Sequence, residues 1–160
     1  MTLKIWRLHD HQSPTGRRDV RSYYDRQPGN VQAAFDFHWE ALEVRLKERW
    51  VRDAAAKLTP EKKNGFRDFY EFRFFEGQLQ QRPIGFFGPV PGVFTLLIWA
   101  TEKGNQFIPV EALATCEKRM NSILSGASQS VPWDENEEND AHDPEKIIQI
   151  PPAWVSKRLR

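Results

Sequence analysis

Three strand-like segments that follow one another closely constrain the fold of this 160-residue chain more than any other feature. They are residues 69–76, 79–87 and 93–100, and each is rich in aromatic and apolar side chains. A short turn containing glycine joins the first two segments, and the glycine- and proline-rich residues 88–92 join the second to the third. Strands joined by so few residues pair as antiparallel neighbours. The sequence therefore predicts an antiparallel sheet from residues 69–100.

Apolar residues at helical spacing predict helices on either side of these strands. A long amphipathic helix is expected behind Pro28-Gly29-Asn30, with apolar side chains recurring every three or four residues as far as Trp50. A second is expected from Pro109 to Leu124, because proline is tolerated in the first turn of a helix. A first strand at residues 3–8 and a short helix at residues 20–25 complete the predicted order.

The end of the chain differs in charge from the rest. Residues 1–125 hold 19 basic and 15 acidic residues, whereas residues 126–160 hold 4 basic and 7 acidic ones. Residues 128–145 contain few apolar side chains, so their burial would not offset the entropy lost on ordering. We therefore expect an acidic, largely disordered tail over residues 126–160, in which residues 147–154 are candidates for a short strand or an extended docking segment.

The chain offers little for a metal, a cofactor or a membrane. Cys116 is its only cysteine, which excludes an internal disulfide and a cysteine-rich zinc site. The sequence contains no glycine-rich phosphate loop, and its longest apolar run, Val93 to Ala100, is too short to span a bilayer. We therefore expect a cytoplasmic protein without a cofactor, a bound metal or a membrane partner.

Arg73 and Arg82 stand out because both lie within the strand-like segments. Two guanidinium groups close together repel one another unless an anion lies between them. One interpretation is that acidic neighbours such as Glu71 and Glu76 form surface ion pairs with these arginines. The other is an anion site, since aromatic and basic residues interleaved along residues 66–75 suit a surface that binds nucleic acid.

Five motifs then follow one another along the chain. They are Phe69-Tyr70-Glu71-Phe72-Arg73, Gln81-Arg82-Pro83-Ile84-Gly85-Phe86-Phe87, Val93-Phe94-Thr95-Leu96-Leu97-Ile98-Trp99-Ala100, Lys103, and a helix from Pro109 to Arg119 that carries Cys116 as a small residue. In order and spacing they resemble the RelE/HigB-like toxins of the RelE/ParE superfamily and their phage-derived relatives. The resemblance covers about residues 66–124.

This resemblance implies an α+β domain over residues 1–125. Its N-terminal strand and helices would pack on one face of a small twisted antiparallel sheet, and a further helix would follow at the C-terminal end. The resemblance also implies the toxin component of a type II toxin-antitoxin system. Such a toxin is an endoribonuclease that cuts messenger RNA, often on the ribosome, and a small antitoxin protein holds it inactive.

The roles of individual residues also come from the resemblance. Attack of a ribose 2′-hydroxyl on the neighbouring phosphate builds negative charge, which cationic side chains can stabilise without a metal. Arg82 would be the principal phosphate clamp, and Arg73 and Lys103 would support it. The residues expected to bind RNA are Arg67, Arg119 and Tyr70.

Three departures from the family pattern favour a second interpretation. Pro83 removes a backbone donor directly after Arg82, so the strand is expected to be edge-like or bulged there. Glu102 stands where the family more often has a lysine, and after Ser125 only His142 offers a histidine or tyrosine to complete an active site. The alternative is a non-catalytic RNA- or protein-binding module of phage origin with the same fold.

Overall fold

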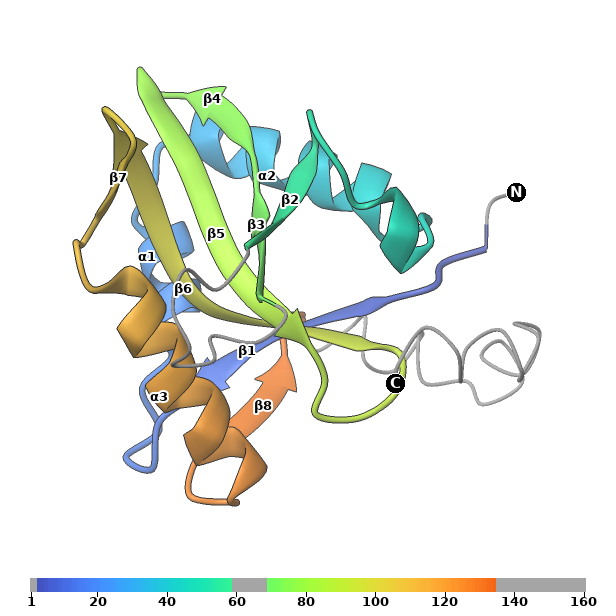
Figure 1. Ribbon diagram of the computed structural model, residues 1–160, viewed down its shortest axis with the longest axis vertical. Helices are drawn as coiled ribbons and strands as arrows, with labels where there is room; N and C mark the ends of the chain where they lie inside the picture. Colours follow the sequence, from blue (N-terminus) through green and yellow to red (C-terminus); the bar gives the residue numbers. More distant parts are fainter. Residues whose placement is uncertain (1–2, 59–68, 135–160) are drawn as a thin grey trace.

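The described residues, 3–58 and 69–134 of the computed structural model, form one sheet with helices against it (Figure 1). The chain begins with one strand and two helices, continues through six strands, and ends with a helix and a last strand. In order these are β1 (Arg7–Gln12), α1 (Asp19–Asp25), α2 (Gly29–Leu42), a 3-10 turn (Lys47–Arg49), β2 (Ala55–Leu58), β3 (Phe69–Phe72), β4 (Phe74–Glu76), β5 (Leu79–Phe87), β6 (Val93–Lys103), β7 (Gln106–Ile108), α3 (Ala112–Leu124) and β8 (Gln129–Pro132).

The sheet is mixed rather than purely antiparallel. Its strand order is β2-β3-β5-β6-β1-β8, with β4 beside β5 and β7 beside β6. The predicted pairing of residues 69–100 is confirmed, because β3, β4, β5 and β6 pair antiparallel. The expectation of an entirely antiparallel sheet is wrong for β1, which runs parallel to β6. Two helices follow β1 along the chain, and parallel pairing needs a long connection of this kind.

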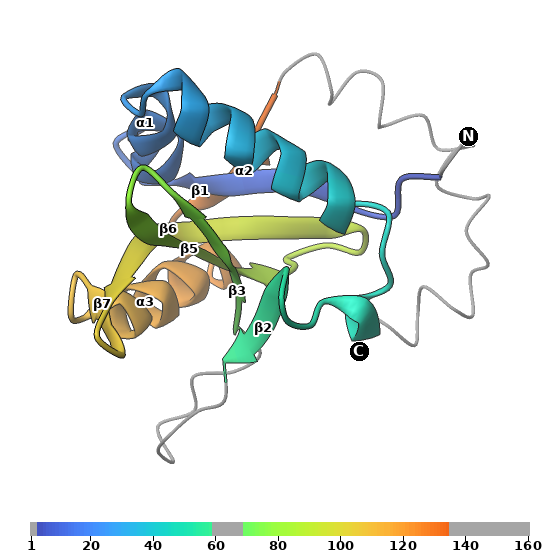
Figure 2. The ribbon, with the colours of Figure 1, turned by 90° about the horizontal axis from the view of Figure 1, so that it is seen from above.

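Helices cover both faces of the sheet. Figure 2 shows α1 and α2 on one face and α3 on the other. The α+β class is confirmed, and the expected packing on one face holds for α1 and α2. Two buried cores result, one under α1 and α2 and one under α3. The first is the more aromatic and includes Trp6, Phe35, Trp39, Trp50, Phe72, Phe94, Trp99 and Trp133.

Strand β3 shows why the sheet is buried on both sides. Tyr70 and Phe72 belong to the core under α2, whereas Phe69 belongs to the core under α3. This alternation is the one expected of a strand, and it confirms that Tyr70 and Phe72 face a core. Glu71 shares the parity of Phe69, so its carboxylate is buried on the α3 side of the sheet.

The long helix is shorter than its apolar pattern predicts. Helix α2 ends at Leu42, yet Trp50 is buried and its ring centroid lies 4.7 Å from that of Phe87 and 4.8 Å from that of Phe94. The chain after the helix therefore remains against the core. The apolar pattern continues past Leu42 because this segment is also buried against the core. Such a pattern indicates which residues are buried and does not show where a helix ends.

The first strand and the end of the domain also differ from the prediction. Strand β1 begins at Arg7 and continues through the polar residues to Gln12, rather than ending at Leu8. Predicted disorder is wrong for residues 128–134, since β8 pairs with β1 and Trp133 is buried against Phe35. The folded domain thus extends beyond residue 125. Residues 135–160, with His142 and the candidate docking segment 147–154, lie outside the described residues.

Candidate functional site

Arg73 and Arg82 come together on the α3 side of the sheet. Arg82 shares the parity of Ile84 in β5, and Ile84 lies in the core under α3. Arg73 follows β3 directly and its guanidinium reaches Glu71 on that same side. The charges of Arg73, Arg82 and Glu102 all act on the pKa of the Glu71 carboxyl. These four side chains, Glu71, Arg73, Arg82 and Glu102, form one arginine–glutamate cluster.

Arg82 is buried, and its guanidinium bonds one carboxylate of the cluster and two other acceptors. Its side chain is only 4% exposed. Nε donates to Glu102 Oε1 at 2.9 Å, Nη1 to the Gln81 carbonyl at 2.8 Å, and Nη2 to Gln80 Oε1 at 3.1 Å. Each guanidinium nitrogen therefore has an acceptor, and three of the five N–H groups donate a hydrogen bond.

Arg73 pairs with the other carboxylate of the cluster, that of Glu71. Its Nη1 donates to Glu71 Oε2, and its backbone N–H donates to the Ala54 carbonyl at 2.9 Å. Burial raises the pKa of the Glu71 carboxyl, and the hydrogen bond from Arg73 opposes that rise. Two guanidinium groups and two carboxylates thus balance in charge. The arginines are paired with acids as one interpretation expected, but Arg82 and Glu71 are buried rather than on the surface. Glu102 takes the place expected for Glu76, which instead accepts from Asn30 at 2.9 Å.

Two of the departures from the family pattern belong to this cluster. Pro83 lies opposite the break between β3 and β4, since β3 pairs with β5 as far as Ile84 and β4 resumes the pairing at Gln81. The missing donor of Pro83 thus coincides with an interruption of the partner strand, as the sequence predicted. Glu102 on β6 pairs with Gln80 on β5 and is therefore the diagonal neighbour of Arg82. Its carboxylate lies within reach of the guanidinium at this diagonal position.

The other predicted site residues within 3–58 and 69–134 are not brought to the cluster. Tyr70 lies on the opposite face of the sheet, in the core under α2. Lys103 is exposed at the end of β6, one residue beyond Glu102 and so of opposite parity. Arg67 lies outside the described residues. Of the five predicted residues that the structure describes, Arg73 and Arg82 lie together and the other three lie elsewhere.

Arg119 has a structural environment instead. From α3 its Nη1 donates to the Leu97 carbonyl in β6 at 2.7 Å, and its Nη2 donates to Asp19 Oδ2 at 2.7 Å. Asp19 is the first residue of α1, so Arg119 links the helices on the two faces around the sheet. Both of these partners of the Arg119 guanidinium are protein groups, one in the sheet and one an acid.

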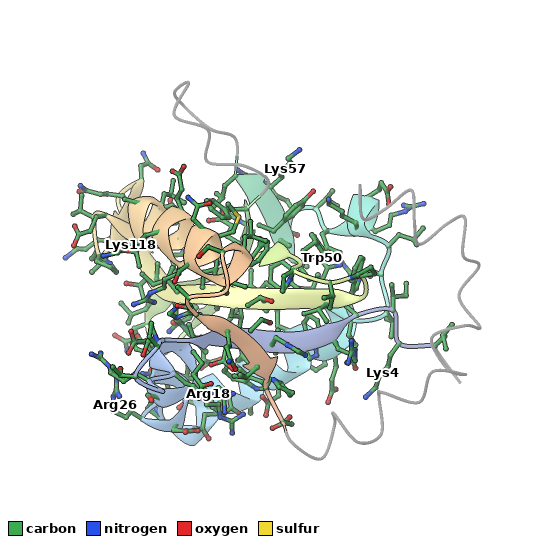
Figure 3. All side chains as sticks on the ribbon, turned by 90° about the horizontal axis from the view of Figure 1, so that it is seen from below. Lys4, Arg18, Arg26, Trp50, Lys57 and Lys118 are labelled. Carbon is green, nitrogen blue, oxygen red and sulfur yellow. The ribbon has the colours of Figure 1, made fainter. Side chains whose placement is uncertain are left out.

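Four basic side chains labelled in one view lie apart from one another. Figure 3 shows Lys4, Arg26, Lys57 and Lys118 on separate parts of the surface. Nucleic-acid binding draws on basic residues concentrated on one face, because each phosphate contact adds to affinity. The labelled side chains are not arranged in that way.

Sequence reasoning missed a polar group on β1. His9, Asp10 and His11 are buried, and Arg18 donates to Asp10 through Nε at 3.1 Å. His9 Nδ1 lies 2.9 Å from Ser130 Oγ, so this group also ties β1 to β8. The sequence signal for this group was His9-Asp10-His11 followed by the basic pair Arg17-Arg18. Strand propensity alone does not identify such a group.

His11 should make stability depend on pH. Burial, with Arg119 nearby, lowers the pKa of His11 to about 4, whereas the group titrates near 6.5 when unfolded. Between these values the unfolded chain binds the proton more readily, so this contribution to stability falls as pH drops from about 6.5 toward 4. Replacing His11 with glutamine should reduce the loss of unfolding free energy between pH 7.5 and pH 5 by about 1–2 kcal/mol.

Urea unfolding of the wild type and of His11→Gln at both pH values measures this effect. The comparison cancels the titration of His38, whose pKa burial also lowers, and of Asp10 and Glu71, whose pKa values burial raises. Parallel pH profiles for the two proteins would show that His11 is not buried as a neutral group.

Within the described residues, no histidine, cysteine, aspartate or glutamate side chains form a group suited to hold a metal ion. Of the helices in residues 3–58 and 69–134, none is long and apolar enough to cross a bilayer. Comparison of the chain with family models, with curated proteins and with solved structures finds no match.

Proposed function

We propose that this chain is a non-catalytic, protein-binding module with the element order of the RelE/HigB-like toxins. The observation that carries the proposal is the pairing of both arginines, Arg82 with Glu102 and Arg73 with Glu71. The resemblance supplies the family, and the order of one strand, two helices, antiparallel strands and a last helix supports it. The cluster then stabilises the sheet rather than binding a phosphate.

Charge argues against RNA cleavage at this cluster. Cleavage through a 2′-hydroxyl needs donors aimed at the phosphate and ready before the reaction begins. Three of the five N–H donors of Arg82 are already occupied and the side chain is buried, so a phosphate that reached it would lie beside the Glu71 and Glu102 carboxylates. Both carboxylates would repel it. The same charge balance favours a protein partner over a polyanion.

A second candidate is the messenger RNA-cleaving toxin, and one observation favours it. Glu71 is a buried carboxyl with a raised pKa beside two arginines, which is the environment of a general base that removes a proton from a hydroxyl. Phe75 on β4 is 61% exposed and would offer a ring on which a base stacks. In this candidate, RNA would open both ion pairs, and a small antitoxin would bind the free toxin.

Incubation of the purified chain with single-stranded RNA, and separately with translating ribosomes, distinguishes the two candidates. We expect no cleavage above that of Glu71→Gln, and no growth arrest when the chain is expressed alone. Arg73→Gln is the matched variant, since Arg73 is more exposed than Arg82 and its loss should disturb the fold less. Cleavage by the wild type that both variants abolish would overturn the binding-module proposal in favour of the toxin.

A further inference from the structure

Phe37 is exposed on the outer face of α2, the side of the helix that points away from the sheet. It is 75% exposed, more than any other large apolar residue in 3–58 and 69–134. Ala33 lies one helical turn before Phe37 and Ala41 one turn after it, and residues four apart share a helix face. The core-facing residues of α2 lie on its other side. Ala33, Phe37 and Ala41 thus form an apolar surface, the outer face of α2.

Two carboxylates border this surface. Asp36 directly precedes Phe37, Glu40 follows it by three residues, and both are exposed. Asp36 accepts hydrogen bonds from the Tyr24 hydroxyl at 2.8 and 3.0 Å, a neutral donor that leaves the carboxylate charge uncompensated. Within the part of the chain that the structure describes, neither carboxylate forms an ion pair. A segment that covers this surface should therefore combine apolar side chains with positive charge.

The chain itself contains a segment of this composition. Residues 146–160, which include the candidate docking segment 147–154, hold four basic side chains and no acidic one. Their apolar side chains include three isoleucines and Trp154. The seven acidic residues of the tail all precede this segment, in residues 134–145. The segment is thus opposite in charge to the border of the outer face of α2.

The described chain ends beside α2. Arg21 Nη1 lies 3.2 Å from Asp134 Oδ1, and the Arg21 guanidinium lies 5.0 Å from the ring centroid of Tyr24, the donor to Asp36. Figure 2 shows the end of β8 on the side of the sheet that α1 and α2 cover. The 11 residues 135–145 separate Asp134 from the segment. Fully extended they span about 35–40 Å, and α2 is about 20 Å long, so the segment can reach the whole helix.

We propose that residues 146–160 dock on the outer face of α2 of the same chain. Their apolar side chains cover Phe37, and their basic side chains lie near Asp36 and Glu40. A short linker holds the segment at an effective concentration in the millimolar range, so a contact with a Kd on the order of 1 mM is about half populated. The inference does not depend on the proposed function, since α2 lies across the sheet from the arginine–glutamate cluster.

Paramagnetic relaxation in nitrogen-15-labelled full-length chain tests this docking. The variant Ser156→Cys carries one nitroxide label within the segment, because Cys116, the only cysteine of the chain, is fully buried. We expect the amide signals of Ala33, Phe37 and Ala41 to weaken about twofold relative to the chain with the label reduced. The amide signals of α3, on the other face of the sheet, should keep their intensity.

Variants of the helix show which groups hold the segment. Phe37→Ala removes the exposed ring and keeps a good helix former, so it should abolish the loss of signal at α2. Phe75→Ala is the matched control, because it removes a ring that is 61% exposed on β4, two residues from Arg73. It should leave the loss unchanged. The double variant Asp36→Asn, Glu40→Gln removes both charges and should reduce the loss, the more so at low salt.

Unchanged α2 signals in the spin-labelled chain would overturn the inference, as would a loss that persists in Phe37→Ala or in the double variant. A mixed sample identifies the chain that supplies the segment. It combines nitrogen-15-labelled chain that carries no nitroxide with spin-labelled chain of natural isotope content. Docking within one chain predicts full intensity at α2 in this mixture. A loss there would mean that the segment of a second copy covers α2, and it would overturn docking within one chain.

Discussion

Replacing Arg82 with alanine is expected to lower the free energy of unfolding by about 3 kcal/mol, measured by urea denaturation at pH 7. The side chain is almost fully buried, and its loss removes three hydrogen bonds at once. It also leaves Glu102, which is 25% exposed, without its ion-pair partner and removes one of the cations near the Glu71 carboxyl. Removing one partner of a buried pair is costly because the other charge stays desolvated.

Replacing the whole Arg82–Glu102 pair should cost much less than removing Arg82 alone. The double variant Arg82→Met, Glu102→Leu leaves no unpaired charge, and apolar replacements of similar volume often match a buried ion pair in stability. We expect it to recover at least half of the loss. Arg73→Ala should cost about 1 kcal/mol, since Arg73 is more exposed and the Glu71 carboxyl can take up a proton.

A loss below about 1 kcal/mol in Arg82→Ala would contradict this account. It would mean that the guanidinium moves freely in solution and is available to a ligand, which would favour the toxin candidate. The expected instability also affects experiments on activity. Loss of growth arrest or of RNA cleavage in Arg82→Ala would report unfolding as readily as lost chemistry, so variants of Arg73 and Glu71 are the better probes.

Local patterns predicted the part of the fold that depends on neighbours in sequence. The bounds of β5 match the prediction of residues 79–87, and α3 ends at Leu124 as expected. Short connections determine how β3 to β6 pair, and helical spacing fixes the buried face of α3. Each of these inferences needed only residues that are close together along the chain.

Long-range pairing was beyond such patterns. Strand β8 is short and polar by composition, and it is ordered because β1 offers it an edge more than 100 residues away in sequence. β1 itself continues through His9, Asp10 and His11. His9 meets Ser130 of β8, and Asp10 accepts from Arg18, the residue before α1. Strand propensity depends on a residue and its neighbours in sequence, so it does not predict partners that come from another part of the sheet.

In the candidate site, too, contacts between residues close in sequence could be predicted and contacts between strands could not. The sequence named Glu71 as a possible ion-pair partner of Arg73 and Arg82, and Arg73 pairs with it, whereas Tyr70, expected to bind RNA, lies in a core. The partner of Arg82 could not be inferred, because Glu102 comes from the next strand and reaches the arginine diagonally. Whether a guanidinium in a sheet binds a ligand or a carboxylate depends on that register.

Replacing Gly85 with alanine should be among the most damaging single changes in this sheet. Gly85 pairs with Tyr70 on β3 and with Leu96 on β6, where Leu97 forms a bulge. A Cβ at this position would lie 2.2 Å from the Thr95 carbonyl oxygen and 2.8 Å from Cε2 of Phe94. No side-chain rotation relieves a clash with backbone, so β5 and β6 would have to separate.

We expect Gly85→Ala to cost about 3 kcal/mol, which for a domain of this size lowers Tm by about 10 °C. Thr95 cannot yield easily, since it is buried and its Oγ1 donates to the Gly88 carbonyl at 2.6 Å. Gly29→Ala is the matched control, because a Cβ there meets nothing within 4 Å at the start of α2. It should leave stability within about 0.5 kcal/mol of the wild type. Equal Tm values for the two variants would mean that β6 lies further from Gly85 than the paired register requires.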